Sequence, residues 1–182
     1  MAGLTVLGEN RLQEAESKAT LVPGASWHLI GPLQSNKARR AVELFDVIES
    51  VDSVELARRL DRLAGELRRA PLGVFLQANV DRDEAKAGFL PDAMEAELAD
   101  LGALPNLRLL GLMTVGRLVG SAEEARPTFR RLRELSERLR GAVPVLGAGL
   151  SMGMTDDYPV AVEEGATVIR VGRALFGARQ TG

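Results

Sequence analysis

The sequence of 182 residues contains no cysteine, which excludes disulfides, thiolate metal sites and a cysteine nucleophile. Its formal net charge is only -2, so charge gives no reason to expect a nucleic acid or an anionic membrane as a partner. No apolar run is long enough to span a bilayer, and residues 1–10 lack the basic region of a signal peptide. These absences predict a cytoplasmic protein that binds neither nucleic acid nor membrane.

The residues that are present have the composition of a globular protein. Hydrophobic residues make up 46% of the chain and charged residues 26%, and the length suffices for one domain with a sizeable core. No stretch reads as a linker or as low-complexity sequence, so we expect a single domain over residues 1–182.

Short, mostly continuous apolar runs alternate with amphipathic helical patterns along the chain. Continuous apolar runs are typical of strands covered on both faces, and strands that alternate with helices favour a parallel sheet with helical crossovers. The predicted strands are 4–8, 27–31, 45–51, 72–80, 107–115, 143–149 and 167–172.

Helix signals lie between these strands. Asp52 or Ser53 can cap a helix that follows, Ser35 or Asn36 another, and Ser121 a third, in which Pro127 predicts a kink or a late start.

Seven strand–helix units with similar spacing indicate an α/β fold: a (β/α)8 TIM-type barrel that lacks one unit. A doubly wound open sheet is the alternative. The Rossmann glycine fingerprint is missing from the first strand–helix turn, which reads "GENRLQE".

Two glycine-containing segments near the C-terminus suggest a phosphate site. If the absent unit is the first of eight, "LSMGMTDD" follows strand seven and "VGRALFG" follows strand eight, where barrels of this class bind phosphate. Ser151 offers a hydroxyl, and Gly172 and Arg173 would present backbone N–H groups at the start of a helix over 173–176. The alternative is that these glycines only form tight turns, and that Asp156 and Asp157 only cap the next helix.

Three further residues stand out at or near strand ends. Arg170 is a charge in an otherwise apolar strand, so it needs a partner, either a ligand ring nitrogen or an internal carboxylate. His28, the only histidine, is by itself more typical of a hydrogen-bonded core residue than of a catalyst. Asn10 lies at the C-terminal end of its strand, where barrel sites lie, but as a pattern it is weak.

The segments "GENRLQE", "WHLIGPLQSNK", "GLMTV" and "LSMGMTDDYPVAVEEGATVIRVGRALFGAR" together resemble the pyridoxal phosphate homeostasis proteins, which look like the N-terminal barrel domain of alanine racemase standing alone. The resemblance covers nearly the whole chain. Two differences are Thr155, where serine is commoner, and Arg173, where threonine is common.

The resemblance implies a site for pyridoxal 5'-phosphate (PLP) in a protein without catalytic residues or metal. Ser151 and the N–H groups of Gly172 and Arg173 would hold the phosphate, and Arg170 would face the pyridine nitrogen. The other edge of the cofactor would be lined by Asn10, His28 and Met113. Apo PLP-dependent enzymes are the implied partners.

Lysine is scarce, and this limits how PLP could be held. The family's cofactor lysine lies on the first barrel strand, ahead of the "GEN" segment, and no such segment occurs here. Lys18, Lys37 and Lys86 occupy a helix, the "SNK" motif and a polar loop. We therefore expect no Schiff base, PLP binding that is non-covalent at best, and an N-terminally truncated barrel. Its open edge would expose Val6 and residues of "TVIRVG", which predicts a monomer of lowered stability or a dimer formed through that edge.

Two other functions remain open from the sequence. One is an amino-acid racemase-like enzyme, against which stand the missing lysine and the absence of a second domain. The other is a barrel enzyme that binds a different phosphorylated metabolite, although no acid–base pair is evident.

Overall fold

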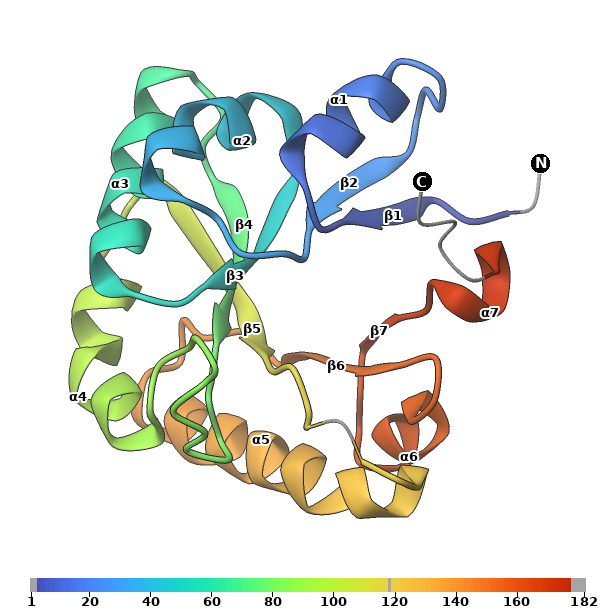
Figure 1. Cartoon of the computed structure of the whole chain (residues 1–182). Helices are drawn as coiled ribbons and strands as arrows, with labels where there is room; N and C mark the ends of the chain where they lie inside the picture. The colour runs from blue at the N-terminus through green and yellow to red at the C-terminus, as the bar shows by residue number, and fades with distance from the viewer. Residues whose placement is uncertain (1–2, 118, 178–182) are drawn as a thin grey trace.

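The computed structural model describes residues 3–117 and 119–177, and within them seven parallel strands form one sheet (Figure 1). The strands are β1 (Val6–Glu9), β2 (Ser26–Leu29), β3 (Val47–Val51), β4 (Leu72–Gln77), β5 (Leu107–Met113), β6 (Gly149–Met154) and β7 (Val168–Arg170). Each strand pairs with the next strand in the sequence, in the order β1 to β7. The sheet curls into a nearly closed barrel, and the prediction of a seven-stranded α/β barrel is confirmed.

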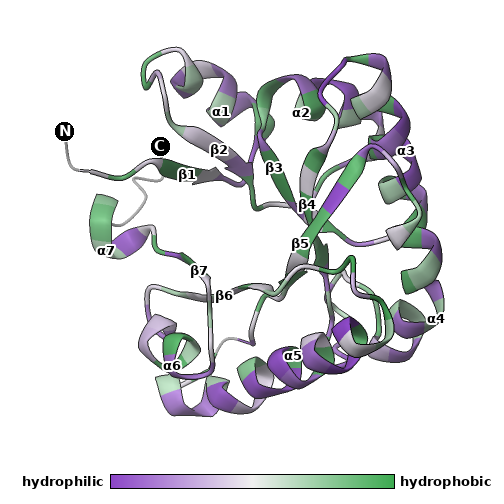
Figure 2. Ribbon diagram, turned by 180° about the vertical axis from the view of Figure 1, so that it is seen from behind, coloured by the Kyte–Doolittle hydropathy of each residue, from purple (hydrophilic) through white to green (hydrophobic). Residues whose placement is uncertain are grey.

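Helices cover the outside of this sheet. They are α1 (Leu12–Ala19), α2 (Ala38–Leu44) with the short 3₁₀ turn η1 (Ser35–Lys37) before it, α3 (Val54–Glu66), α4 (Pro91–Gly102), α5 (Ala122–Ala142), α6 (Tyr158–Glu163) and α7 (Arg173–Phe176). Figure 2 shows purple, hydrophilic segments on the outer faces of the larger helices and green, hydrophobic segments toward the strands. Among the described residues, no helix is both long and apolar enough to cross a membrane.

Most of the apolar core lies between the sheet and these helices. Helix α3 illustrates why, because its apolar residues recur on one face and Leu56, Leu60 and Leu63 are buried there. Its N-cap is Ser53, whose side chain accepts a hydrogen bond from the backbone N–H of Leu56. A second, smaller apolar cluster lies on the other face of the sheet, inside the barrel.

Two expectations about local structure are wrong, and a third is narrowed. The sixth strand is not 143–149, because α5 reaches Ala142, a turn containing Pro144 follows, and β6 begins only at Gly149. Neither Ser35 nor Asn36 is an N-cap, because they belong to η1 and Lys37 caps α2. Of the two alternatives at Pro127, the late start is excluded, because α5 begins at Ala122 and runs through Pro127.

The shift of β6 changes the interpretation of "LSMGMTDD". Most of this segment is strand rather than a loop that wraps an anion. A Cβ on Gly149 would lie 2.7 Å from the Leu110 carbonyl oxygen, and one on Gly153, whose φ is +88°, would lie 2.5 Å from the Ala161 Cβ. The glycines therefore allow β6 to pack closely against its neighbours.

The two ends of the sheet differ from its middle. Strands β1 and β7 each pair on one side only within the described residues. Val6 on β1 is 50% exposed and Ile169 on β7 is 39% exposed, while all five residues of the central strand β3 are buried. The expected exposure of apolar residues at an open edge is therefore confirmed.

Candidate functional site

The predicted site residues lie at or just beyond the C-terminal ends of the parallel strands. Met113 and Arg170 are the last residues of β5 and β7, and His28 lies within β2. Asn10 directly follows β1, and Gly172 is the N-cap of α7. All parallel strands of a barrel end at the same face, which is where barrel active sites are built.

A buried polar network crosses the barrel interior and links three of these positions. Glu49 on β3 is 1% exposed, and its two carboxylate oxygens have different partners. Oε1 lies 2.7 Å from Nδ1 of His28, and Oε2 accepts a hydrogen bond of 2.5 Å from the hydroxyl of Ser151. Arg170 in turn donates from Nη1 to the Ser151 oxygen over 2.6 Å. Ser151 therefore joins the carboxylate of Glu49 to the guanidinium of Arg170.

The guanidinium of Arg170 has one more described partner, the backbone oxygen of Thr114, which accepts from Nη2 over 2.7 Å. Burial lowers the pKa of Arg170 below its usual value, and the carboxylates of Glu49 and Asp157 oppose that shift. An arginine starts from so high a pKa that it stays protonated. A guanidinium has five N–H donors, so Arg170 can serve a further acceptor besides Ser151 and Thr114.

Irregularities in the sheet place the members of this network. The register between β3 and β4 shifts between Ile48 and Val51, around Glu49, and the register between β6 and β7 shifts between Ser151 and Met154. Each shift inserts one extra residue into one strand, which bends that strand and changes the direction of its side chains. Such bulges cannot be read from apolar periodicity. The sequence signal for Glu49 was its charge within the apolar run 45–51, and that signal was overlooked.

The loop after β6 and the start of α7 lie at the same end of the barrel. Met154 is in register with Arg170, so Thr155 follows β6 where Val171 and Gly172 follow β7. The side chains of Arg173 and Asp156 form an ion pair that ties the two segments together. A Cβ on Gly172 would meet nothing within 4 Å, so open space borders the first N–H groups of α7, which have no partner within the helix.

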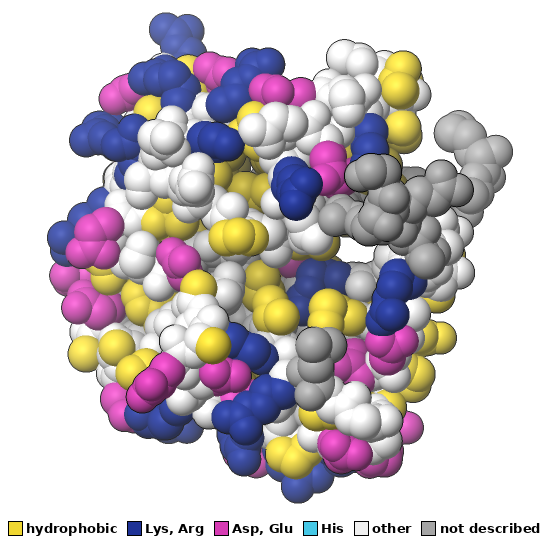
Figure 3. Space-filling model, viewed as in Figure 1, with side chains coloured by type: hydrophobic (Ala, Val, Ile, Leu, Met, Phe, Trp, Pro, Cys, Tyr) yellow, Lys and Arg dark blue, Asp and Glu magenta, His cyan; other side chains and the backbone are white. Residues whose placement is uncertain are grey.

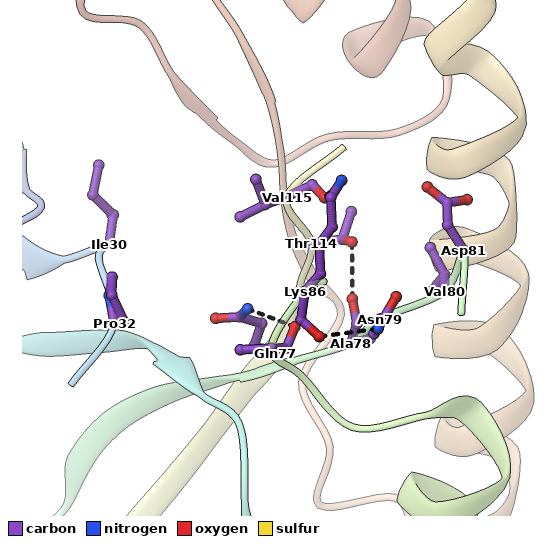
Figure 4. Close-up of a pocket in the computed structure, with 11 residues that line it drawn as sticks. Ile30, Pro32, Gln77, Ala78, Asn79, Val80, Asp81, Lys86, Thr114 and Val115 are labelled. Atoms are coloured by element: carbon purple, nitrogen blue, oxygen red, sulfur yellow. Dashed lines mark hydrogen bonds between the residues drawn. The ribbon is translucent and has the colours of Figure 1, made fainter. Parts of the chain in front are cut away.

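A cavity of about 210 Å³ opens at the ends of β4 and β5, and it is lined in part by Thr114, whose backbone oxygen bonds Arg170. Figure 4 shows Gln77, Thr114, Val115 and Lys86 around it. The Lys86 ammonium donates to the backbone oxygen of Val115 over 3.1 Å, so this lysine lies at the barrel mouth. Seen as in Figure 1, hydrophobic side chains lie at the centre of the surface, with Lys, Arg and acidic side chains beside and around them (Figure 3).

The structure thus brings His28, Met113, Ser151 and Arg170 together around the barrel interior. His28 is buried and hydrogen-bonded, which is the interpretation its sequence context favoured. Met113 is fully buried and lies in register with Ser151. Ser151 is also fully buried, and its single proton is committed to Glu49, which does not fit the expected role of a phosphate donor.

The comparisons with known proteins agree with this architecture. The family model described as "Alanine racemase, N-terminal domain" matches residues 1–180. An alanine racemase of Clostridium difficile, 17% identical, shares the fold with a TM-score of 0.78 over 97% of this chain and 48% of its own.

More similar proteins identify the family within this fold. The "Pyridoxal phosphate homeostasis protein" of Pseudomonas aeruginosa is 43% identical over 185 residues, covering all of this chain and 77% of that protein. PipY of Synechococcus elongatus has been solved without PLP, with 49% identity and a TM-score of 0.91, and with PLP bound, with 48% identity and a TM-score of 0.88. In both comparisons, the aligned part is 97% of this chain and 83% of the PipY chain. The chain belongs to the pyridoxal phosphate homeostasis protein family.

Proposed function

We propose that this protein binds PLP at the C-terminal end of its barrel and takes part in PLP homeostasis without catalysing a reaction. The observation that carries this proposal is the half-buried Arg170, which is held by Ser151 and by Thr114, a residue that also lines the cavity, and which lies close to the start of α7. The PLP-bound structure of PipY and the names of the relatives support the choice of ligand.

The residues of the site fit the two ends of this cofactor. Arg170 has donors left and would donate to the ring nitrogen, while the N–H groups of Gly172 and Arg173 and the hydroxyl of Thr155 would hold the phosphate. Asn10, His28 and Met113 would line the remaining edge. We reassign Ser151 from the phosphate to the support of Arg170, because its proton is donated to Glu49.

The chemistry of Arg170 favours a carrier over a catalyst. When bound, PLP supplies an aldehyde and an electron-withdrawing pyridine ring. Because a guanidinium can only donate hydrogen bonds, a ring nitrogen that accepts from Arg170 stays unprotonated, and the ring is then a weaker electron sink. We propose apo PLP-dependent enzymes as the recipients of the cofactor and the cytoplasm as the location.

Equilibrium dialysis against PLP, followed by borohydride reduction and intact-mass measurement, tests this proposal. We expect saturable, reversible binding with a Kd of roughly 10 μM to 1 mM, and no stable mass increase. A stoichiometric adduct at Lys86 would show that PLP binds covalently at the barrel mouth rather than non-covalently. An absence of saturable binding, or turnover of alanine or serine, would overturn the proposal.

A matched pair of substitutions locates the phosphate. Gly172→Asp introduces a carboxylate where the N–H groups of α7 begin, and Gly141→Asp introduces the same side chain at the end of α5, where a Cβ also meets nothing within 4 Å. We expect Gly172→Asp to weaken PLP binding about tenfold or more through charge repulsion, and to weaken pyridoxal, which lacks the phosphate, much less. Gly141→Asp should leave both affinities unchanged, and equal losses in the two variants would argue against a phosphate site at Gly172.

A further inference from the structure

We infer that Glu49 is a positioning residue: through the hydroxyl of Ser151 it fixes the charge and the orientation of Arg170, and thereby gives the site its preference for a ligand with an aromatic ring nitrogen. This inference rests on the proposed function. Glu49 was not singled out in the sequence, although it is a charge in the apolar run 45–51 just as Arg170 is in its strand.

Burial is the first reason for this role. Glu49 is 1% exposed and Ser151 is fully buried, so water does not solvate their charge and hydroxyl. A buried carboxylate persists only when it is paired and hydrogen-bonded. Glu49 uses both oxygens in this way, toward His28 and toward Ser151.

The direction of the hydrogen bonds is the second reason. The hydroxyl of Ser151 has one proton, which it donates to Oε2 of Glu49, so its lone pairs face Arg170 and accept from Nη1. Without the carboxylate, the Ser151 proton loses its acceptor, and the lone pairs of the hydroxyl are no longer held toward Arg170. Glu49 therefore sets the polarity of the bond that orients the guanidinium.

Charge balance is the third reason. Burial disfavours the charged form of Arg170, and Glu49 is one of the two carboxylates that oppose this effect. The second, Asp157, accepts from the backbone N–H of Met154 and is the N-cap of α6. Glu49 is thus the carboxylate that also shares a hydrogen-bonding partner with Arg170.

The role can be separated from mere structural support by ligand selectivity. Glu49→Gln keeps the shape of the side chain and removes its charge. The two probes are PLP and its 1-deaza analogue, in which C–H replaces the ring nitrogen. We expect the unaltered chain to prefer PLP by about tenfold, since only PLP accepts a bond from the guanidinium. Glu49→Gln should weaken PLP binding about fivefold to tenfold and bring this preference close to one.

The matched control is Glu164→Gln, which removes a carboxylate that is also buried and also paired with arginines, but between α5 and α6. It should leave both affinities within about twofold. In an Arg170→Gln background, Glu49→Gln should cause no further loss of PLP affinity, because its effect passes through Arg170. Ser151→Ala, which removes only the bridge, should lower the preference for PLP in the same direction and provides the test if Glu49→Gln does not fold.

The outcomes separate this inference from the proposed function. If the unaltered chain binds PLP and Glu49→Gln or Ser151→Ala retains the tenfold preference, the positioning role is overturned and the proposed function stands. If both probes weaken equally in Glu49→Gln, Glu49 is only structural and the inference is again overturned. If the unaltered chain binds neither probe, both are overturned.

Discussion

The two faces of the sheet are built differently. Toward the helices, the sheet packs into a continuous apolar cluster that includes residues of β2 to β6 and of α1 to α6. Toward the barrel interior, the apolar cluster consists of Val47, Phe75 and Met113, with Leu110 and Val168 at its margin. Between this apolar cluster and the strand ends, the interior is lined by polar side chains, above all Glu49, Ser151 and Arg170.

This difference separates stability from binding. Removal of apolar surface from water is the main stabilising contribution to folding, and most of that surface lies between sheet and helices. Because the helix-facing cluster supplies most of the stability, the barrel interior can hold a buried charge network. Substitutions on the helix-facing side should change stability only, whereas substitutions in the interior should also change ligand binding.

The largest effect is expected on the helix-facing side. Phe129 of α5 is 1% exposed, and Phe129→Ala should lower the free energy of unfolding by about 3–5 kcal/mol through the cavity it leaves. Phe176 of α7 is 77% exposed, and Phe176→Ala should change the free energy of unfolding by less than about 0.5 kcal/mol. Urea unfolding followed by circular dichroism measures both, and a loss at Phe176 as large as at Phe129 would show that α7 is covered in solution.

Two fully buried methionines allow the faces to be compared directly. Met94 lies on α4 in the helix-facing cluster and Met113 lies in the interior cluster. Each Met→Ala change should lower the free energy of unfolding by about 2–5 kcal/mol. Only Met113→Ala should also alter PLP affinity in equilibrium dialysis. Equal binding by the two variants would remove Met113 from the site.

A smaller effect is expected from the outer ion-pair network. Burial of Glu164 opposes its ionisation, but a hydrogen bond from Arg126 and the charges of Arg133 and Arg130 outweigh burial and lower the pKa of Glu164. A lowered folded-state pKa stabilises the protein above the unfolded-state pKa, and this contribution is lost as pH falls through the folded-state pKa.

Glu164→Gln should therefore lower the urea midpoint at pH 7. The difference from the unaltered chain should shrink as pH falls below the ordinary glutamate pKa of about 4.3. Urea titrations from pH 7 to pH 3 measure this trend. A difference that grows toward acid pH would mean that Glu164 is not stabilised as a carboxylate.

The smallest effect is expected at the ends of the sheet. Val6→Thr and Ile169→Thr replace side chains that are already half exposed, so each should change the free energy of unfolding by less than about 1 kcal/mol. Analytical ultracentrifugation of the unaltered chain and both variants measures whether each is a monomer or a dimer, the two states expected from an exposed sheet edge. A dimer that dissociates in either variant would assign the interface to the edge.

The sequence predicted the barrel well because its main signals are periodic. Apolar runs located six of the seven strands, and Ser53 and Ser121 marked helix starts that the structure confirms. The sixth strand was misplaced because "VPVLGAG" is apolar and predicts a strand. The glycines of the true strand, "GLSMGM", suggested a loop, although they are there for close packing. Close packing between strands is a tertiary constraint that a local pattern does not record.

The candidate site was predicted only in part, for a related reason. Arg170 was conspicuous because a charge interrupts an apolar strand. Thr114, which bonds Arg170, and Glu49, which bonds Ser151, were missed because these contacts join segments far apart in the sequence. Lys86 was correctly assigned to a polar loop, but its position in the sequence does not show that the loop brings it to the barrel mouth.

A crystal structure of the chain grown with PLP tests this site most directly. We predict the pyridine nitrogen within hydrogen-bond distance of the Arg170 guanidinium, and the phosphate at the N–H groups of Gly172 and Arg173. We also predict that the Ser151 hydroxyl still bridges Arg170 and Glu49. A cofactor bound elsewhere, or a phosphate oxygen bonded to Ser151 in place of Glu49, would contradict these predictions.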